Sequence, residues 1–280
     1  MSRTKPWELS DDLWQRAEPL IPVRAGKRKA GRPRQSDRAM LGAILYVLRT
    51  GIQWNALPRE VGASTTVYDR FRFWLTAGFF QQFWAAGLAE CDELVGIEWE
   101  WQSLDGAMTK APFARAATAV AEGIGHNPTD RGKYGTKRST LSEGHGLPLA
   151  IAVAGANVHD TNLVAETLDG IIIARPSSEQ HLCLDAGYVG PQTAQTVADH
   201  EYVAHVRPRG EEAAQARSSD PTKTPRRWVV ERLHSWLNRS RRVLVRWEKR
   251  KDTYLAFLHR ACALICFQQC ARFRAALLSE

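Results

Sequence analysis

The sequence predicts an α/β protein in which a helical region precedes a mixed β-sheet with flanking helices. Apolar residues recur at helical spacing through the first hundred residues, and alternating or fully apolar segments typical of strands follow. A long basic helix comes near the end of the chain, after a polar loop at 211–225. We therefore predict a helical domain over residues 1–96 and a sheet-containing domain over residues 97–280.

Two serines mark the start of the first helices. Ser10 precedes DDLWQRAEPL and Ser36 precedes DRAMLGAILYVLRT, and a serine hydroxyl in this position accepts a hydrogen bond from an otherwise free helix amide. Gly51 is the expected end of the second helix. A glycine-containing turn then leads into a helix that carries Arg70 and Arg72. This order is the outline of a helix-turn-helix unit, although any three-helix bundle gives much the same outline.

Strand patterns begin near residue 97. The segment GIEWEWQSLD alternates with period two, and we predict a strand that ends at Asp105. The segment GTKRSTLSEGHGLPLAIAVAG reads as two strands joined around residues 144–146, and the second is so apolar that both of its faces are expected to be buried. HLCLDAGYVG is a short strand that closes on Asp185.

Helices are predicted between the later strands. Asp160 is a suitable N-cap for the segment DTNLVAETLDGIII, and Pro191 suits the first position of the helix PQTAQTVADH. EYVAHVRPR follows as a further strand. The order strand, hairpin, helix, strand, helix, strand and long helix predicts a mixed sheet with helices on its faces.

Positive charge is concentrated in two segments. The formal net charge is +8, and residues 221–280 alone carry 14 Lys and Arg against 4 Asp and Glu, a net of +10. The other segment, RAGKRKAGRPR at 24–34, ends in GRPR, which is typical of basic arms that enter the DNA minor groove but also of a solvated linker. Two separated basic patches favour nucleic acid or an anionic membrane as the partner.

Nucleic acid is the favoured partner, because the sequence carries no membrane signal. No apolar run approaches the roughly 20 residues that span a bilayer, and neither an amphipathic anchor nor a lipidation signal is present. The segment MSRTKPWELSDDLW lacks the apolar stretch of a secretory signal, so we expect a cytoplasmic protein. The cysteines are too scattered for a disulfide framework, and Cys262, Cys266 and Cys270 are expected to pack as small core hydrophobes rather than to bind zinc.

Three carboxylates stand out by their positions. Asp105 and Asp185 end predicted strands, and sites in α/β sheets form beyond the carboxyl ends of strands; each aspartate could equally cap a turn. Glu231 is the one acid in RRWVVERLHSWLNRSRR, on a helix predicted from about 226 to 245. It lies about 200° from Val229 around that helix and therefore off the apolar stripe.

Two explanations suit a carboxylate among arginines. An exposed ion pair is the ordinary one. The other is metal chemistry on a polyanion: carboxylate oxygens suit Mg²⁺ or Mn²⁺, and two such ions about 3.5–4 Å apart support an in-line phosphoryl displacement. Arginines on the same face would then hold the DNA backbone.

Five segments match a known family in their order and spacing: SLDGAMTKAP, NPTDRGKYGTKRS, GANVHD, LCLDAGYVG and RRWVVERLHSWLNRSRR. With LSDDLWQRAEPLIP, GRPR and TGIQWNALP in the helical region, the chain resembles the DDE transposases of the bacterial IS5 family over nearly its whole length. The resemblance implies a ribonuclease H-like catalytic domain preceded by a helical DNA-binding region. It also implies that Asp105, Asp185 and Glu231 form a catalytic triad that binds two Mg²⁺ ions, for which Mn²⁺ can substitute.

The activity implied by the resemblance is DNA transposition. The protein would cleave the ends of an insertion sequence and join the freed 3′-OH to target DNA. Its partners would be double-stranded terminal inverted repeats and target DNA, bound by a homodimer in the cytoplasm, at the nucleoid, with no membrane involved. Two alternatives stay open, namely a catalytically silent DNA-binding regulator that retains the fold and a nuclease without strand transfer.

Related transposases carry a signature around the glutamate, with tyrosine and arginine before it and lysine after it. Arg227 matches the arginine, whereas Thr224 occupies the position of the tyrosine and Asn238 that of the lysine. Arg239 or Arg242 is therefore our hypothesis for the phosphate contact. The other residues predicted to bind DNA, mostly at its backbone, are Lys133, Lys137, Arg138, Arg32, Arg34, Arg70 and Arg72.

Overall fold

The structure is a computed structural model that describes residues 8–23, 34–206 and 228–278. Its helical region contains α1 (Asp11–Ala17), α2 (Asp37–Thr50), α3 (Ser64–Thr76) and α4 (Phe79–Val95). The sheet region contains β1 (Trp101–Lys110), β2 (Gly125–His126), β3 (Tyr134–Glu143), β4 (Pro148–Gly155), α5 (Val164–Asp169), β5 (Gln180–Leu184), α6 (Pro191–Asp199) and β6 (Tyr202–Val206). The chain then continues into α8 (Trp228–Asn238), α9 (Arg241–Leu244) and α10 (Lys251–Leu277).

The predicted ends of the first helices are confirmed. The hydroxyl of Ser10 accepts a hydrogen bond from the amide of Leu13 at 3.2 Å, and that of Ser36 accepts one from Ala39 at 3.2 Å. Gly51 ends α2 in the left-handed conformation, with φ of 72°. The caps fix where each helix begins, and so they fix which side of the helix faces the core.

One mixed sheet forms the middle of the molecule. β3 pairs antiparallel with β1 and with β4, while β5 pairs parallel with β1 and with β6. The strands therefore lie in the order β4-β3-β1-β5-β6, and the short β2 adds to β3. The predicted fold class, a ribonuclease H-like mixed sheet preceded by a helical region, is confirmed by this order.

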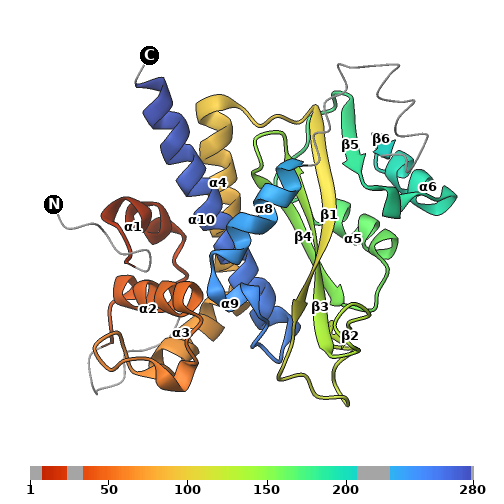
Figure 1. Cartoon of the computed structure of the whole chain (residues 1–280). Coiled ribbons are helices and arrows are strands. Elements are labelled where there is room, and N and C mark those ends of the chain that lie inside the picture. The colour runs from red at the N-terminus through yellow and green to blue at the C-terminus, as the bar shows by residue number, and fades with distance from the viewer. Residues whose placement is uncertain (1–7, 24–33, 207–227, 279–280) are drawn as a thin grey trace.

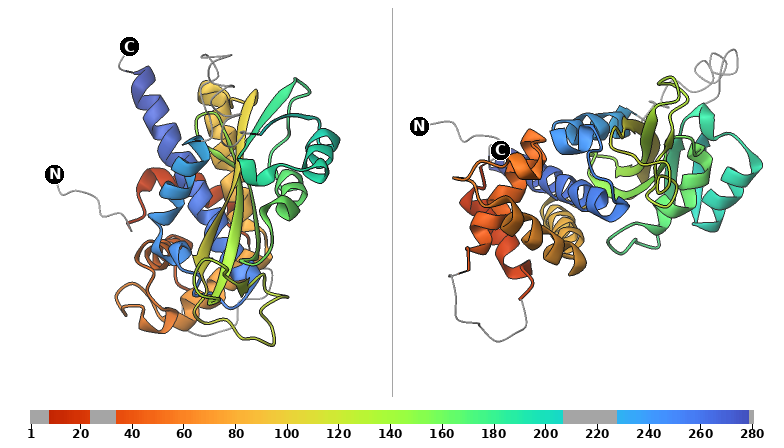
Figure 2. Two further views of the ribbon diagram at one scale, coloured as in Figure 1. Left: turned by 45° about the vertical axis from the view of Figure 1, so that its right-hand side comes forward. Right: turned by 90° about the horizontal axis from the view of Figure 1, so that it is seen from below.

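Helices cover both faces of the sheet. α8 and α10 pack on one face, against β1, β3 and β4, while α5 packs on the other face of β3 and β4 and α6 packs beside β6. Figure 1 shows α4 and α10 running side by side between the sheet and the helices α1, α2 and α3, and the view from below in Figure 2 shows these layers in succession. Among the helices that the structure describes, none combines the length and the apolar character needed to cross a membrane.

The central strand β3 is buried although it is polar. The buried polar side chains of this strand are Thr136, Lys137, Arg138, Ser139, Thr140, Ser142 and Glu143. Buried polar groups need hydrogen-bond partners, and each helix or turn packed against β3 supplies some. The hydroxyl of Ser139 accepts a hydrogen bond from Thr167 of α5 at 2.7 Å, and the carboxylate of Glu143 accepts one from the amide of Leu147 at 2.7 Å.

Three boundaries differ from those predicted. β1 does not end at Asp105 but runs on to Lys110, because β3 continues to pair with it after β5 has diverged. The helix predicted from 226 to 245 ends at Asn238 and restarts at Arg241 as α9. The helical turn after β4 is capped by the side chain of His159 rather than of Asp160, whose carboxylate instead accepts a hydrogen bond from Lys137.

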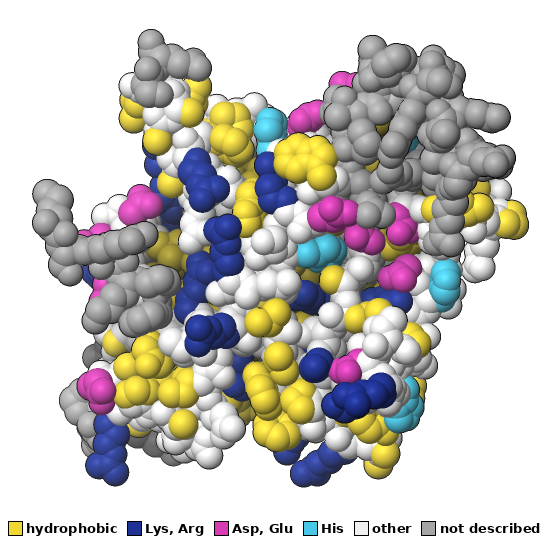
Figure 3. All heavy atoms as spheres, in the orientation of Figure 1, with side chains coloured by type: hydrophobic (Ala, Val, Ile, Leu, Met, Phe, Trp, Pro, Cys, Tyr) yellow, Lys and Arg dark blue, Asp and Glu magenta, His cyan; other side chains and the backbone are white. Residues whose placement is uncertain are grey.

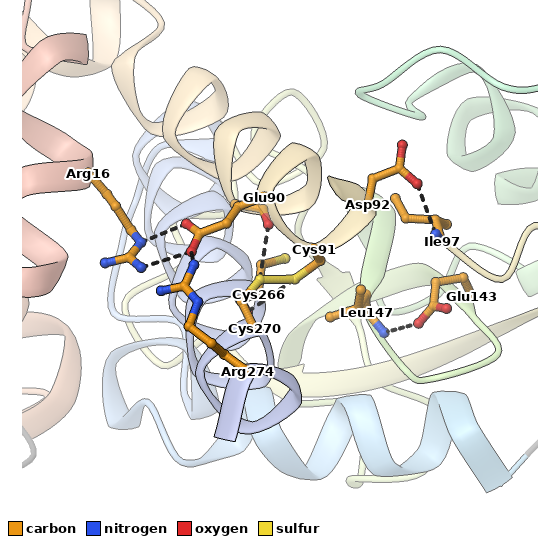
Figure 4. Close-up of a disulfide and its surroundings, with 11 residues drawn as sticks. Arg16, Glu90, Cys91, Asp92, Ile97, Glu143, Leu147, Cys266, Cys270 and Arg274 are labelled. Carbon is orange, nitrogen blue, oxygen red and sulfur yellow. Dashed lines mark hydrogen bonds and ion pairs between the residues drawn. A yellow bond between two sulfur atoms is a disulfide. The ribbon is translucent and has the colours of Figure 1, made fainter. Parts of the chain in front are cut away.

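The hydrophobic core runs across the boundary predicted at residue 96. A single cluster of buried side chains includes residues of α2, α3 and α4, of the sheet and of α10. Figure 4 shows how α10 is tied to the helical region: Glu90 of α4 accepts hydrogen bonds from Arg16 at 2.6 Å and from Arg274 at 2.7 Å. The division into two domains remains a prediction.

A disulfide joins α4 to α10, which corrects the expectation that all the cysteines of α10 are free. Cys91 and Cys270 are bonded, with Cα atoms 5.2 Å apart (Figure 4). Cys262 and Cys266 are free and buried, as expected of small core hydrophobes. The sequence could not predict the bond, because its partners are separated by 179 positions.

We predict that breaking this bond lowers the thermal stability of the protein. A disulfide that closes a long loop stabilises a protein by about 2–4 kcal/mol, which corresponds to roughly 3–7 °C in Tm for a chain of this size. Calorimetry of the oxidised protein should show this decrease on Cys91→Ala or on addition of a thiol reductant. Cys183→Ala removes a cysteine that does not belong to this bond and is the control; equal Tm values for the oxidised and reduced proteins would contradict the prediction.

Candidate active site

Asp105 and Asp185 lie at the same level on neighbouring strands. The parallel pairing of β1 with β5 places Ser103 opposite Cys183. Each aspartate follows two residues later, and because side chains alternate with period two, both aspartates belong to the face of the sheet that carries Ser103 and Cys183. Neighbouring strands are about 4.8 Å apart. The two carboxylates are therefore neighbours at the point where β5 ends and β1 continues.

α8 packs over this same face. Thr140 of β3 is the register partner of Asp105, and directly opposed residues of antiparallel strands point to one face. The hydroxyl of Thr140 lies 3.4 Å from Nε2 of His234 on α8. The face of Asp105 is therefore the face that α8 covers.

Glu231 stands on α8 one turn before His234. Residues three apart on a helix are neighbours on its surface, and three residues advance about 4.5 Å along the axis. Glu231 is exposed, whereas Asp105 and Asp185 are half-buried. The helix thus brings the third carboxylate to the rim of the site, above the side of β1 that carries Asp105.

Both aspartates also accept hydrogen bonds from backbone amides that follow them in the chain. One oxygen of Asp105 accepts a hydrogen bond from the amide of Gly106 at 2.8 Å, and one of Asp185 accepts from the amide of Gly187 at 2.6 Å. The capping role that the sequence left open for both residues is therefore present. These bonds orient the carboxylates, and a carboxylate retains several further lone pairs for a cation.

The imidazole of His234 is kept uncharged beside the carboxylates. Burial, together with the charge of Arg138, lowers the pKa of His234 to about 3. Its Nδ1 atom is buried and has no hydrogen-bond partner among the described residues. Positive charge at neutral pH must therefore come from a bound cation or from the surrounding arginines.

The three carboxylates suit a hard divalent cation by their chemistry, since oxygen ligands are what Mg²⁺ and Mn²⁺ prefer. Within residues 8–23, 34–206 and 228–278, however, no three His, Cys, Asp or Glu side chains converge closely enough to hold a metal ion. The register brings Asp105 and Asp185 together as a pair, and Glu231 approaches them on a separate helix.

An ion pair between the buried Lys137 and the half-buried Asp160 supports the strand beneath the site. Nζ of Lys137 donates to Asp160 at 2.9 Å and to the carbonyl oxygen of Val158 at 2.7 Å. The other oxygen of Asp160 is buried and occupies the space in which a Cβ atom on Gly106 would lie. Any side chain at position 106 would therefore require the carboxylate of Asp160 or the strand to move.

Four of the basic residues predicted to bind DNA are instead bonded inside the protein. They are Arg70, Lys137, Arg138 and Arg242, all less than 9% exposed. Arg138 donates to Asn238 at 3.0 Å, Arg242 donates to Glu248 at 2.6 Å, and Arg70 pairs with Asp37. Because buried charges need partners, these side chains stabilise the fold and are not presented to a ligand.

The other predicted contacts divide into two groups. Lys133, Arg239 and Arg34 are exposed, and Arg72 is half-buried, 3.2 Å from Asp252. Arg32 and Arg227 lie outside the described residues. Figure 3 shows a band of Lys and Arg side chains on the face that α8 and α10 occupy, with a group of Asp and Glu side chains beside it.

Residues of α8 that sequence reasoning missed have a place in the site. His234 of α8 contacts Thr140, the residue paired with Asp105. Asn238 accepts a hydrogen bond from Arg138. Helical spacing puts His234 one turn from Glu231, so the sequence contained a signal for it. The sequence contained no signal for Thr140, because its pairing with Asp105 depends on how β3 aligns with β1 in the folded protein.

Two family models match the chain. One, described as "Putative transposase of IS4/5 family", matches residues 9–84, and the other, described as "Transposase DDE domain", matches residues 102–266. The first covers the helical region as far as α4, and the second covers the sheet together with α8, α9 and most of α10.

Similar proteins include two from Burkholderia cepacia. One is a "Putative transposase for insertion sequence element IS402", to which the chain is 32% identical over 154 residues. The alignment covers 53% of this chain and 70% of that protein. The chain is also 32% identical over 124 residues, 43% of its length and 84% of the other's, to an IS402 protein of 16.2 kDa without an assigned function.

Among solved structures, a chain of the pre-cleavage Mos1 transpososome aligns with this protein at 8% identity and a TM-score of 0.28. The alignment covers 93% of this chain and 86% of the Mos1 chain, and the likeness is too distant to carry an argument. The family models decide the assignment, since the DDE domain alone spans more than half of the sequence. The chain belongs to the DDE transposases of the IS4/5 family.

Proposed function

We propose that this transposase cleaves the ends of its insertion sequence and joins the freed 3′-OH to target DNA, with Asp105, Asp185 and Glu231 as the catalytic carboxylates. The observation that supports this most directly is the register of β1 and β5, which sets the two aspartates side by side under α8. Family membership supports the reaction class.

Membership of the DDE family implies a divalent metal, and we propose two Mg²⁺ ions, replaceable by Mn²⁺. Asp105 and Asp185 would share one ion, and Glu231 would complete the site of the second. Bound there, the ions would lower the pKa of a nucleophile and stabilise the leaving oxygen of an in-line displacement.

The protein's own groups position the carboxylates. The amides of Gly106 and Gly187 hold one oxygen of each aspartate, and the packing of His234 on Thr140 sets how closely α8 approaches β1. Because Glu231 is exposed at the start of α8, it remains accessible to a DNA strand that lies along this face.

DNA is the proposed partner, both as terminal inverted repeats and as target. The exposed Lys133, Arg239 and Arg34 supply positive charge at the surface, and such charges bind the phosphate backbone. A homodimer would pair the two ends of the element, and the protein would act at the nucleoid.

One observation favours a second candidate, a regulator that binds DNA without cutting it. In the part of the chain that the structure describes, the three carboxylates do not form a ready metal site. Displacement of a catalytic group by about 1 Å is enough to silence a site. Strand-transfer products formed in Mg²⁺ or Mn²⁺ would exclude this candidate.

We predict that Asp105→Asn, Asp185→Asn and Glu231→Gln each reduce strand joining to the level seen without protein, because each amide removes a negatively charged metal ligand. A labelled duplex with the inverted repeat that flanks the gene, a target plasmid and Mg²⁺ or Mn²⁺ provide the assay. Affinity for the duplex should stay within a few-fold of wild type.

Asp199→Asn is the matched control for these variants, because Asp199 is an exposed carboxylate on α6. It should join strands at the wild-type rate. If Glu231→Gln joined strands at the wild-type rate, Glu231 would not be a catalytic residue. If joined products formed equally well in the presence of a chelator, the reaction would not depend on a metal ion.

Gly106→Ala should reduce strand joining about 100-fold while leaving DNA binding intact. The new methyl group overlaps the carboxylate of Asp160, so either this carboxylate must leave its place beside Lys137 or β1 must shift beside Asp105, and small displacements of catalytic groups are costly. Gly42→Ala is the control, since its methyl group would meet only Leu9, at 3.9 Å. Equal joining rates for the two variants would contradict the proposed tight packing.

His234 should make the protein less stable in acid. Its folded pKa of about 3 lies below the ordinary value of 6.5, so between these values the unfolded chain binds a proton that the folded chain does not. The free energy of unfolding should therefore fall as pH is lowered through this window. Urea unfolding at neutral pH and at about pH 4.5 should show a smaller fall for His234→Gln than for wild type.

The exposed histidine His126 provides the control for this comparison. His126→Gln should lose as much stability in acid as wild type does. His259, whose pKa burial lowers to about 4, contributes equally to all three proteins. A fall for His234→Gln as large as that of wild type would mean that His234 is not buried in its neutral form.

A further inference from the structure

A hollow on the face beside α8 is lined by three arginines from three parts of the chain. Arg49 comes from the end of α2, Arg239 follows α8, and Arg272 comes from α10. The hollow is shallow and open to solvent, and Trp236 and Gln268 complete its walls. It lies in the region in which Figure 3 shows Lys and Arg side chains gathered.

The positive charge of the hollow continues into the protein. Arg260 of α10 is fully buried, and none of its three guanidinium nitrogens has a hydrogen-bond partner within the described residues. Nε of Arg49 is also buried and unpartnered. Buried donors without acceptors are costly and uncommon, and here they lie behind an arginine-lined surface.

The positive charges of Arg49, Arg239 and Arg260 repel one another. Burial and the charge of Arg49 lower the pKa of Arg260 to about 9, and burial and the charge of Arg239 lower the pKa of Arg49. Arg260 gains one weak compensation, because its Cζ atom lies 5.6 Å from the ring centre of Phe83. An anion in the hollow would relieve this repulsion.

Nearby arginines are already neutralised, which distinguishes them from this cluster. Arg242 is paired with Glu248, and Arg274, two residues from Arg272, is paired with Glu90. Within the described part of the chain, Arg272 donates to the neutral side-chain amide of Gln269, at 3.4 Å, and is paired with no carboxylate. The arginines that line the hollow can therefore bind an anion from another molecule.

We propose that Arg49, Arg239 and Arg272 together bind one backbone phosphate of the DNA. The proposal rests on the proposed function, because DNA is the anion that the catalytic face would meet. Arg239 follows Glu231 by eight residues, about 12 Å along the helix axis. With about 3.4 Å of rise per nucleotide in a strand, the bound phosphate lies three or four nucleotides from the one that is cut.

The closing experiment measures duplex affinity as a function of salt concentration. Each phosphate neutralised contributes about 1 to the slope of log K against log salt. Arg239→Gln and Arg272→Gln should each weaken binding several-fold for any sequence and reduce the slope by about 1. Because both arginines hold the same phosphate, the double variant should also reduce the slope by about 1. A reduction by about 2 would show separate contacts and overturn the shared site.

Arg274→Gln is the matched control, since it removes one positive charge from α10 outside the hollow. Its slope should equal that of wild type. Equal slopes for Arg272→Gln and wild type would overturn the inference while leaving DNA binding, and thus the proposed function, intact.

A second measurement tests the hollow without DNA. Inorganic phosphate should raise the Tm of wild type relative to chloride at equal ionic strength, and should do so less for the double variant. Arg260→Met should raise the Tm in chloride and reduce the increase caused by phosphate. If wild type bound no duplex but kept this phosphate response, the proposed function would fail and the anion site would stand; equal phosphate responses in all variants would overturn the site itself.

Discussion

The need to bond the buried polar side chains of β3 holds the catalytic half of this transposase together. Both faces of β3 are covered, yet the strand reads YGTKRSTLSE. Each polar group must find a partner, and the partners lie on different elements: Thr167 on α5, Asp160 before it and Asn238 on α8. A net gain of about 1 kcal/mol per bond matters less than the cost of leaving one unmade. The bonds therefore specify where each helix sits.

This constraint reaches the proposed active site through β1. The pairing of β3 with β1 sets Thr140 beside Asp105, and the contact of Thr140 with His234 brings α8, and Glu231 with it, over the same face. The pairing of β1 with β5 adds Asp185. The carboxylates come from segments far apart in the sequence, so their approach depends on two strand registers and one helix contact. A shift of one residue in either register would turn an aspartate to the opposite face.

Arginine serves two purposes in this chain, and burial separates them. Arg138 and Arg242 are paired internally and act as structural ties. Arg239 and Arg272 are exposed beside a hollow, and the buried Arg260 of the same helix as Arg272 has no hydrogen-bond partner among the residues that the structure describes. A fold that leaves a fully buried cation without an acceptor loses stability. Such a loss is reasonable at a surface that must hold a polyanion, because the bound phosphate restores part of it.

The sequence alone determined the class of fold, the caps at Ser10 and Ser36 and the end of the strand before Asp185, because caps, periodicity and many strand ends are local properties. The end of β1, beyond Asp105, was decided by its pairing with β3. The lone acid in a basic helix drew attention to Glu231, and the family resemblance gave it a catalytic role. Only the tertiary structure decided which arginines face solvent, that Asp160 pairs with Lys137, and that Cys91 bonds to Cys270. Burial and pairing depend on which distant segment covers a residue, and the local pattern of the chain does not record that.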